Sequence, residues 1–322
     1  MIDLKPLLNA VRLAATVTRR IQAHGIGARD KGVQDPVTLA DYASQIILCR
    51  AVAAAFPDDA IMGEERAAVF DTTMDAAAQE TIARFVSETL GETITVDQCR
   101  AWLEHGRDRD PSRLWLIDPV DGTKGYVAGR RYAIAMALLA DGLPIAGIIG
   151  APDPAAKDGG RVFYGQGTAA YMESLSGGRA ERIAVTGVAN PRKWRAVESV
   201  ERSHGNFGAA DRIYAALGIP QAQIGHFDSA VKYAMLSAGE AEMFLRVPRD
   251  AAWVNLAWDH GPGVALLQAA GGVVTDLEGA LIDFSTGAKL TARGMIATNG
   301  TIHDRILEVI QEALRMDEGQ TG

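Results

Sequence analysis

The chain has 322 residues, of which 48% are hydrophobic and 22% are charged. This composition is typical of a soluble globular protein and excludes an intrinsically disordered one. At roughly 150 residues per domain, the length predicts two domains or one large one. The net charge of −8 argues against binding to long nucleic acid, because that binding relies on cationic side chains that release counterions. Small anionic ligands are not excluded, because a few local cations or a metal can outweigh the average field.

Cysteine content and hydropathy limit the cellular setting. Cys49 and Cys99 are too few for a disulfide framework or for a zinc site of their own. Charged residues interrupt the apolar stretches near the N-terminus, so we expect no secretion signal there. The longest uninterrupted apolar run, residues 133–140, is much shorter than a membrane-spanning helix. We therefore expect a cytoplasmic protein without a membrane partner.

The first hundred residues are predicted to be helical. Apolar residues recur at helical spacing over residues 3–23 and again over residues 40–56. Residues 71–113 are rich in polar and helix-forming residues, and Thr95 and Gln98 form a capping-box pattern that opens a short helix. Because this stretch separates two candidate site segments, we expect it to be an insertion that covers the site.

Strand patterns begin at residue 114. Residues 132–139 and 145–149 flank Asp141-Gly142, which is a hairpin signal, and residues 163–172 suggest a second strand pair. From about residue 180 onward, predicted strands (195–199, 241–245, 272–275, 295–298) alternate with predicted helices (209–217, 229–238, 263–270, 301–316). This order predicts an α+β N-terminal half followed by an α/β C-terminal half. We divide the chain into domains 1–175 and 176–322.

The strongest chemical signal is the segment Asp118-Pro-Val-Asp121-Gly122-Thr123, which follows an apolar strand. Its two carboxylates are three residues apart, and Pro119 bends the chain between them. Mg²⁺ requires oxygen ligands at close range, so two aspartates on one turn suit such ions. The backbone N–H groups of Gly122 and Thr123 suit a phosphate oxygen. The alternative, a strand that ends in a simple Asx turn, explains one Asp-Gly pair but not the whole string.

Three other acidic positions are weaker signals on their own. Glu64 follows an apolar segment that resembles a strand, although paired glutamates are usually solvated. Asp259 follows Trp258 near the start of a helix, where it could serve merely as an N-cap. Asp41 likewise opens a predicted helix. His260 is interpreted as a neighbour of Asp259 rather than as a ligand.

Together these segments resemble the inositol monophosphatase superfamily of Mg²⁺-dependent, lithium-sensitive phosphatases. The resemblance covers nearly the whole chain and rests on three motifs in the family's order: Gly63-Glu64-Glu65, Asp118-Pro-Val-Asp121-Gly-Thr123, and Trp258-Asp259 with Ala269-Ala-Gly-Gly272. It implies a layered α/β/α/β/α sandwich.

Within the superfamily, the chain is most similar to the 3'(2'),5'-bisphosphate nucleotidase branch. Four segments carry this likeness: Asp35-Pro-Val-Thr38-Leu-Ala-Asp41-Tyr42, Val197-Glu-Ser-Val200 with Ser203-His204, Asp228-Ser229-Ala-Val-Lys232-Tyr233, and Phe244-Leu-Arg246-Val-Pro248. The chain departs from the branch at Gly205-Asn206, where an acidic pair is more usual. It departs again at Gly261-Pro262-Gly263, which replaces a more alanine-rich helix start.

The resemblance implies a role for each matching residue. The ligands of two or three Mg²⁺ ions would be Glu64, Asp118, Asp121, Asp259 and the backbone carbonyl of Val120. Asp41 and Thr123 would orient and deprotonate the attacking water, while the amides of Gly122 and Thr123 hold the scissile phosphate, with no covalent phosphoenzyme. The nucleotide contacts would be His204, Ser229, Lys232 and Arg246.

Two of these nucleotide contacts have simpler explanations. His204 could be a surface histidine, and Lys232 an ordinary exposed helix lysine. Because Ser229 and Lys232 are three residues apart in a predicted helix, we expect their side chains on one face of it.

The implied activity removes the 3'-phosphate of 3'-phosphoadenosine 5'-phosphate, a by-product of sulfate activation and sulfotransfer. Two alternatives stay open. The first is the same chemistry on an inositol phosphate or on histidinol phosphate. The second is a catalytically silent nucleotide-binding regulator, against which the full set of carboxylates argues. The expected partner is a small nucleoside bisphosphate, and the oligomeric state is left open.

Overall fold

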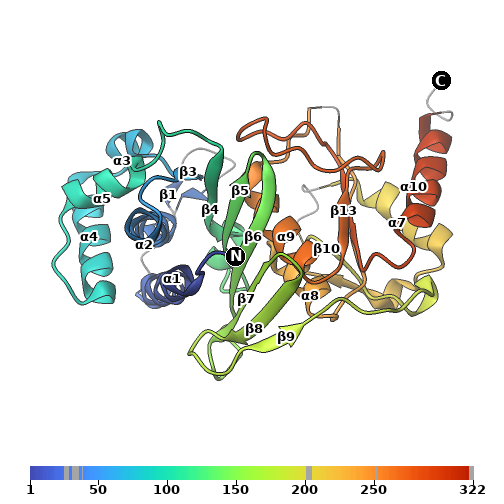
Figure 1. The fold of residues 1–322 in the computed structure, drawn as a ribbon, viewed down its shortest axis with the longest axis horizontal. Helices are drawn as coiled ribbons and strands as arrows, with labels where there is room; N and C mark the ends of the chain where they lie inside the picture. Colours follow the sequence, from blue (N-terminus) through green and yellow to red (C-terminus); the bar gives the residue numbers. More distant parts are fainter. Residues whose placement is uncertain (25–28, 31–35, 38, 201–204, 251, 319–322) are drawn as a thin grey trace.

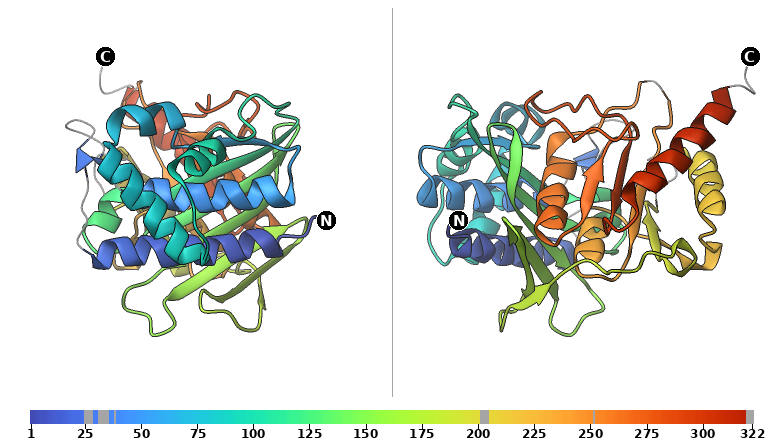
Figure 2. Two further views of the ribbon diagram at one scale, coloured as in Figure 1. Left: turned by 90° about the vertical axis from the view of Figure 1, so that its left-hand side faces the viewer. Right: turned by 45° about the vertical axis from the view of Figure 1, so that its right-hand side comes forward.

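The computed structural model describes residues 1–24, 29–30, 36–37, 39–200, 205–250 and 252–318. Helices and sheets alternate in five layers, in agreement with the α/β/α/β/α sandwich that the sequence resemblance implies. Figure 1 shows α1 to α5 on one side of the first sheet, α8 and α9 between the two sheets, and α7 and α10 beyond the second sheet. The right view of Figure 2 shows the same succession, and the left view looks onto the helices of the first layer.

The first layer consists of helices, as the hydrophobic periodicity predicts. Its members are α1 (Lys5–Ala23), α2 (Leu39–Ala55), α3 (Ala67–Thr73), α4 (Ala76–Leu90) and α5 (Val96–Glu104). The predicted capping box is confirmed, because Thr95 and Gln98 exchange both hydrogen bonds at the start of α5. Helices α4 and α5 pack against α2. None of the described residues that line the cavity discussed below comes from 71–113, so the expectation that this segment covers the site is wrong.

The second layer is a seven-stranded sheet. Its order is β3 (Ala60–Gly63), β4 (Arg113–Asp121), β5 (Ala133–Ala140), β6 (Leu143–Pro152), β7 (Gly160–Gln166), β8 (Ala169–Ser174) and β9 (Glu181–Ile183). Strands β3 and β4 are parallel, and the other neighbours are antiparallel. The predicted hairpin joins β5 to β6 through Asp141 and Gly142, both at positive φ, as a tight hairpin turn requires. Because β9 belongs to this sheet, the sheet extends past the boundary predicted at residue 175.

Side chains of the central strands alternate between two cores. Trp115 of β4 joins the core beneath α1 and α2, whereas Leu114 and Leu116 join the core shared with α9. Successive residues of a strand point to opposite faces, so a strand covered by helices on both sides is apolar at every position. This explains why the longest apolar run in the sequence is β5.

The remaining layers come from the C-terminal half. Helices α8 (Val231–Ser237) and α9 (Ala257–Ala269) lie between the sheets, and α9 is buried on nearly all sides because both of its faces are covered. The second sheet has the order β11 (Ile224–His226), β10 (Ala196–Glu198), β12 (Met243–Arg246), β14 (Met295–Thr298) and β13 (Val273–Thr275). Helices α7 (Phe207–Leu217) and α10 (His303–Glu318) form the last layer.

The second sheet is mixed rather than wholly parallel. Strand β10 runs parallel to β11 and β12, whereas β14 runs antiparallel to both β12 and β13. Short elements complete the described chain: β1 (Arg29–Asp30), β2 (Pro36–Val37), α6 (Thr123–Val127), η1 (Pro191–Lys193) and η3 (Gln221–Gln223). Among the described helices, none combines the length and apolar character needed to cross a bilayer.

Candidate active site

A β-bulge brings two aspartates to the same face of the first sheet. Asp118 of β4 pairs with Ala135 of β5, and Asp121 pairs with Ala133, so one extra residue is inserted in β4 between them. Positions three apart in a regular strand point to opposite faces, but one extra residue restores the same face. The bend predicted at Pro119 is therefore this bulge, and it directs both carboxylates toward the α9 side of the sheet.

Three elements bring further carboxylates to the same place. The parallel pairing of β3 with β4 places Glu64 beside the end of β4, where its N–H donates to the carbonyl of Ile117 at 3.1 Å. Asp259 lies in the first turn of α9, and Leu256 is the N-cap residue, so the alternative that Asp259 is merely an N-cap is wrong. Asp41 lies in the first turn of α2 and is 2% exposed.

These elements enclose a cavity of about 370 Å³ between the two halves of the chain. It brings together most of the predicted site residues: Glu64, Asp118, Val120, Asp121, Gly122, Thr123, Ser229, Lys232, Arg246 and Asp259. Asp41 does not line the cavity, but its charge acts on Asp118. His204 lies outside the described residues.

The electrostatics of this cavity are those of a cation site. Burial raises the pKa of Asp118 well above its usual value, and the negative charges of Glu64, Asp121, Asp259 and Asp41 raise it further. Burial also raises the pKa of Asp121, against the opposing effects of Lys232, the Ala230 N–H and Arg246. The buried Oδ1 of Asp118 accepts no hydrogen bond from the described residues. A hard divalent cation would satisfy this oxygen and offset the mutual repulsion of the carboxylates.

The donor set therefore fits Mg²⁺, which prefers carboxylate and carbonyl oxygens. Across the described residues, no three carboxylate, imidazole or thiol groups already stand together as a complete metal cluster. The side chains of Glu64, Asp118, Asp121 and Asp259 all line this cavity and would supply the carboxylate ligands.

The turn after β4 is shaped by Gly122 and Thr123. Gly122 adopts φ of +85°, a region that favours glycine, and a Cβ there would lie 3.3 Å from Cβ of Ser229. The Thr123 hydroxyl donates a hydrogen bond to the carbonyl of Val120 at 3.1 Å. Because its proton is used in this way, the Thr123 oxygen faces any nearby water as an acceptor.

The loop before α8 completes the cavity from the C-terminal half. Ser229 adopts φ of +71° and precedes the first residue of α8, Val231. The expectation that Ser229 and Lys232 share one helix face is therefore wrong, because Ser229 is not helical. Its left-handed backbone directs the next N–H, that of Ala230, to donate to Oδ2 of Asp121.

Lys232 is buried rather than exposed on a helix, so the simpler explanation for it is wrong. It is 3% exposed, and its Nζ donates to the carbonyls of Phe227 at 3.1 Å and Ser229 at 2.8 Å. Burial, followed by the charge of Arg246, lowers the pKa of Lys232 to about 8. Two of its three N–H groups thus hold the loop, which leaves one for a ligand.

Arg246 ends β12, where the sequence also placed a strand end. Its Nη1 donates to Oδ1 of Asn255 and to Nε2 of His260, both at 3.3 Å, and its guanidinium lies 5.8 Å from the ring centre of Trp253. Its buried Nε has no hydrogen-bond partner among the described residues. An unpartnered buried donor is energetically costly, and an anionic acceptor brought against it would offset that cost.

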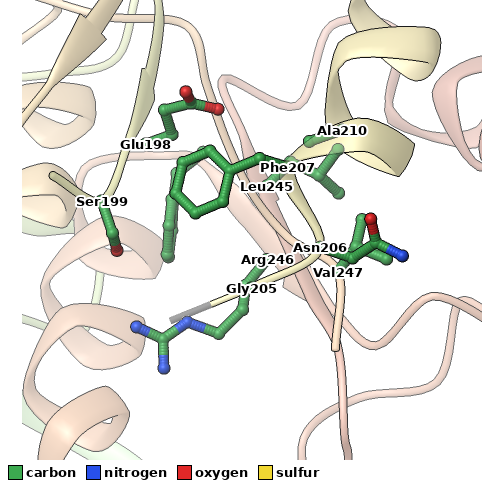
Figure 3. A pocket seen from close by; sticks show the side chains of 10 residues that line it. Glu198, Ser199, Gly205, Asn206, Phe207, Ala210, Leu245, Arg246 and Val247 are labelled. Atoms are coloured by element: carbon green, nitrogen blue, oxygen red, sulfur yellow. The ribbon is translucent and has the colours of Figure 1, made fainter. Parts of the chain in front are cut away.

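A second cavity, of about 20 Å³, adjoins Arg246 on the side of α7. Glu198, Phe207 and Leu245 gather at one end of it, and the guanidinium of Arg246 lies at the other (Figure 3). Asn206, one of the residues at which the sequence departs from the nucleotidase pattern, is the N-cap of α7 and accepts from the Ala209 N–H at 3.0 Å. This capping role explains the polar residue there.

Sequence reasoning assigned no task to several residues around the cavity. Asp228 forms an ion pair with Arg130 at 3.1 Å, and Tyr233 hydrogen-bonds to His260 at 2.9 Å. Asp228 and Tyr233 lie in a segment that carries the nucleotidase resemblance, which is the signal that could have found them. No local pattern indicates Asn255, because its partners include the distant carbonyls of residues 292 and 293.

The layered fold and its carboxylate-lined cavity define an enzyme of the phosphatase class. The chain matches the inositol monophosphatase family over residues 3–315. It therefore belongs to this family, whose members are generally metal-dependent phosphatases.

Relatives with assigned names agree with this membership. A 3'(2'),5'-bisphosphate nucleotidase 2 of Candida albicans is 30% identical over 338 residues, which cover 94% of each chain. A 3'(2'),5'-bisphosphate nucleotidase of Oryza sativa is 32% identical over 340 residues, covering 97% of this chain and 94% of the relative. The solved structure of the extragenic suppressor protein suhB from Bartonella henselae has a TM-score of 0.66 at 20% identity and covers 95% of this chain and 97% of its own. That likeness concerns the fold.

Proposed function

We propose that this chain is a Mg²⁺-dependent phosphatase that hydrolyses the 3'-phosphate of 3'-phosphoadenosine 5'-phosphate, giving AMP and phosphate. The observation that carries the proposal is that one cavity holds both a carboxylate cluster and the cations Lys232 and Arg246. A cluster of carboxylates needs a metal ion before it can hold one phosphate, whereas a second phosphate needs cations of the protein itself. The names of the relatives support a bisphosphate nucleotide as the substrate.

The metal would be held by Glu64, Asp118, Asp121, Asp259 and the carbonyl of Val120. When bound, Mg²⁺ supplies the positive charge that activates water and neutralises the leaving oxygen. The backbone amides of Gly122 and Thr123 would hold the oxygens of the scissile phosphate. Because phosphoryl transfer has a loose transition state, the main tasks of these residues are positioning and charge stabilisation.

The attacking water would be controlled by Asp41 and Thr123. The Thr123 hydroxyl donates its hydrogen bond to the Val120 carbonyl, so its oxygen would accept a hydrogen bond from one O–H of the water and orient it. Asp41 is buried at the start of α2 and does not itself line the cavity, so its role as the base that takes the proton from the other O–H rests on the family resemblance. No covalent intermediate on the protein is required.

The second phosphate would be held by Lys232 and Arg246. Lys232 keeps one N–H for the ligand, and Arg246 offers its unpartnered Nε. Ser229 lines the same cavity and would add a hydroxyl contact. We also propose that the enzyme clears the by-product of sulfate activation in the cytoplasm and that lithium inhibits it.

A substrate panel tests the proposal. Phosphate release is measured with Mg²⁺ from 3'-phosphoadenosine 5'-phosphate, inositol 1-phosphate and histidinol phosphate at equal concentration, with and without lithium. We expect the highest kcat/KM on the bisphosphate, with Asp121→Asn as the control for contaminating phosphatase. Preference for either of the other esters would favour the same chemistry on that substrate. Release from none of them would favour a nucleotide-binding regulator.

A further inference from the structure

A network of buried side chains surrounds the guanidinium of Arg246. His260 and Asn255 each accept a hydrogen bond from Nη1 at 3.3 Å. His260 is 1% exposed, and it hydrogen-bonds through its other ring nitrogen to the Tyr233 hydroxyl at 2.9 Å. None of these three partners is a predicted ligand of the metal or of the substrate. Their common feature is that they act on Arg246, directly or through one another.

The hydrogen bonds of this network have one consistent direction. A guanidinium only donates, so Nε2 of His260 must accept from Arg246, and the imidazole proton must lie on Nδ1. Nδ1 then donates to the Tyr233 oxygen, and the Tyr233 hydroxyl donates to the sulfur of Met295 at 3.9 Å. Each group thus donates to the next, from Arg246 at the cavity to Met295 in the core. This order fixes both the tautomer and the ring orientation of His260.

Asn255 is fixed in the same way from the opposite side. Its Nδ2 donates to the carbonyls of Ala292 and Arg293, both at 2.8 Å, so its Oδ1 must point toward Arg246. The same oxygen accepts from Nε1 of Trp253 at 2.9 Å. Arg246 is therefore held between two acceptors whose orientations are each set by the core.

The Gly261-Pro262-Gly263 departure belongs to this network. Gly263 lies three residues after His260 on α9, and a Cβ there would lie 2.2 Å from Cδ2 of Tyr233. The absence of a side chain at Gly263 lets the Tyr233 ring lie directly against α9, within reach of His260. Gly263 thus makes room for the residue that orients the imidazole.

We infer that His260 is a positioning residue, which together with Asn255 holds the Arg246 guanidinium toward the second phosphate of the substrate. This inference rests on the proposed function, because it gives Arg246 a remote phosphate to bind. A flexible arginine would lose side-chain entropy on binding that phosphate, and a pre-positioned arginine has already lost it. His260 therefore affects the preference for a substrate with two phosphates over a substrate with one. It does not act on the cleavage of the 3'-phosphate ester bond.

Two variants at this position separate positioning from simple packing. His260→Leu has similar bulk but no acceptor for Arg246, whereas His260→Gln retains an amide oxygen that can accept. The substrates are 3'-phosphoadenosine 5'-phosphate and 3'-AMP, which differ only in the 5'-phosphate. We expect His260→Leu to lower the ratio of the two kcat/KM values about tenfold, mainly through KM, which is the scale of one charged hydrogen bond. His260→Gln should restore most of that ratio.

A binding measurement without metal gives an independent readout. AMP retains the 5'-phosphate and adenosine does not, so calorimetry with each ligand reports the contact to Arg246 directly. We expect His260→Leu to weaken AMP binding about tenfold and to leave adenosine binding unchanged. Tyr233→Phe keeps the ring but removes the acceptor for Nδ1, and it should weaken AMP binding several-fold. This variant replaces His260→Leu in the test if His260→Leu does not fold.

The outcomes distinguish this inference from the function on which it rests. A wild-type enzyme that does not prefer the bisphosphate to 3'-AMP would overturn the proposed function and the inference with it. A wild-type enzyme that has the preference, but whose His260→Leu variant loses kcat equally on both substrates, would overturn the inference alone. In that case His260 would act through its neighbour Asp259.

Discussion

The backbone N–H of Ala230 donates a hydrogen bond to the Asp121 carboxylate, although the two residues are 109 positions apart. This contact joins the loop before α8 to the bulged end of β4. Lys232 holds the same loop through the carbonyls of Phe227 and Ser229. A carboxylate of the first half is thus oriented by the backbone of the second half, so the cavity is complete only when both halves are folded together.

Asp121→Asn should lower turnover on the bisphosphate by orders of magnitude and leave the fold intact. The amide oxygen can still accept from the Ala230 N–H, but the side chain no longer carries the charge that attracts a cation. Phosphate release with Mg²⁺ measures the first effect, and thermal unfolding measures the second. Near-normal turnover would show that Asp121 is not part of the metal site.

Asp41 and Thr123 should behave as one unit. If both act on the same water, each single Ala variant loses much of kcat and the double variant loses little more, because residues that share one task are not additive. The four kcat values of this double-mutant cycle are compared at saturating bisphosphate. Losses that multiply would argue against a shared water.

Arg246→Ala should weaken kcat/KM for the bisphosphate by roughly 2–3 kcal/mol, the scale of a charged hydrogen bond. The loss on 3'-AMP should be much smaller, because that substrate has no second phosphate. Lys232→Ala should differ, since it also frees the carbonyls of Phe227 and Ser229 and so lowers Tm and activity on both substrates. If Arg246→Ala lowers both activities equally, Arg246 serves the metal site or stability instead.

The contribution of Asp118 and Asp121 to the stability of the metal-free protein should fall as the pH rises. Burial and neighbouring carboxylates raise the pKa of Asp118 above its ordinary 3.8, and burial raises that of Asp121. A group with a raised pKa in the folded state stabilises the fold at low pH, and this stabilisation is lost as the pH rises from the ordinary pKa through the raised one. His260 and His303, whose pKa values are lowered by burial, act in the opposite sense, so the test is a comparison with Asp118→Asn. We expect the Tm in EDTA of the wild type, relative to that of Asp118→Asn, to be lower at pH 8 than at pH 5.

Added Mg²⁺ should raise Tm more at pH 8 than at pH 5, because protonated carboxyls bind the ion poorly. Asp118→Asn is the matched control, because it keeps the shape of the side chain but has no carboxyl that titrates. A Tm difference between the wild type and Asp118→Asn that does not change between pH 5 and pH 8 in EDTA would contradict the raised pKa of Asp118.

Gly263→Ala should destabilise the protein by about 1–3 kcal/mol, the usual cost of overpacking a core. Its new methyl would meet the ring of the buried Tyr233, with Cβ only 2.2 Å from Cδ2. Gly187→Ala is the control, since that glycine is exposed and a Cβ there meets nothing within 4 Å. Urea unfolding measures both variants, and equal stability of the two would contradict the tight contact.

Local features were determined by the sequence alone, because they depend on neighbours along the chain. The capping box at Thr95 and the hairpin at Asp141-Gly142 involve only residues within a few positions of one another. The motif from Asp118 to Thr123 is of the same kind, since a strand, a proline and a glycine turn set its backbone. The division into domains at residue 175 stays a prediction.

Only the tertiary structure decided how distant residues meet. The helical spacing of Ser229 and Lys232 suggested one helix face, but packing against Gly122 and Asp121 holds Ser229 in a left-handed conformation outside the helix. Residues 71–113 likewise pack against α2 through α4 and α5 and do not line the cavity. His260 meets Arg246 because α9 lies between the two sheets, and the free energy that places it there comes from burying apolar surface on both faces. Such burial is a property of the whole fold, so no local pattern reports it.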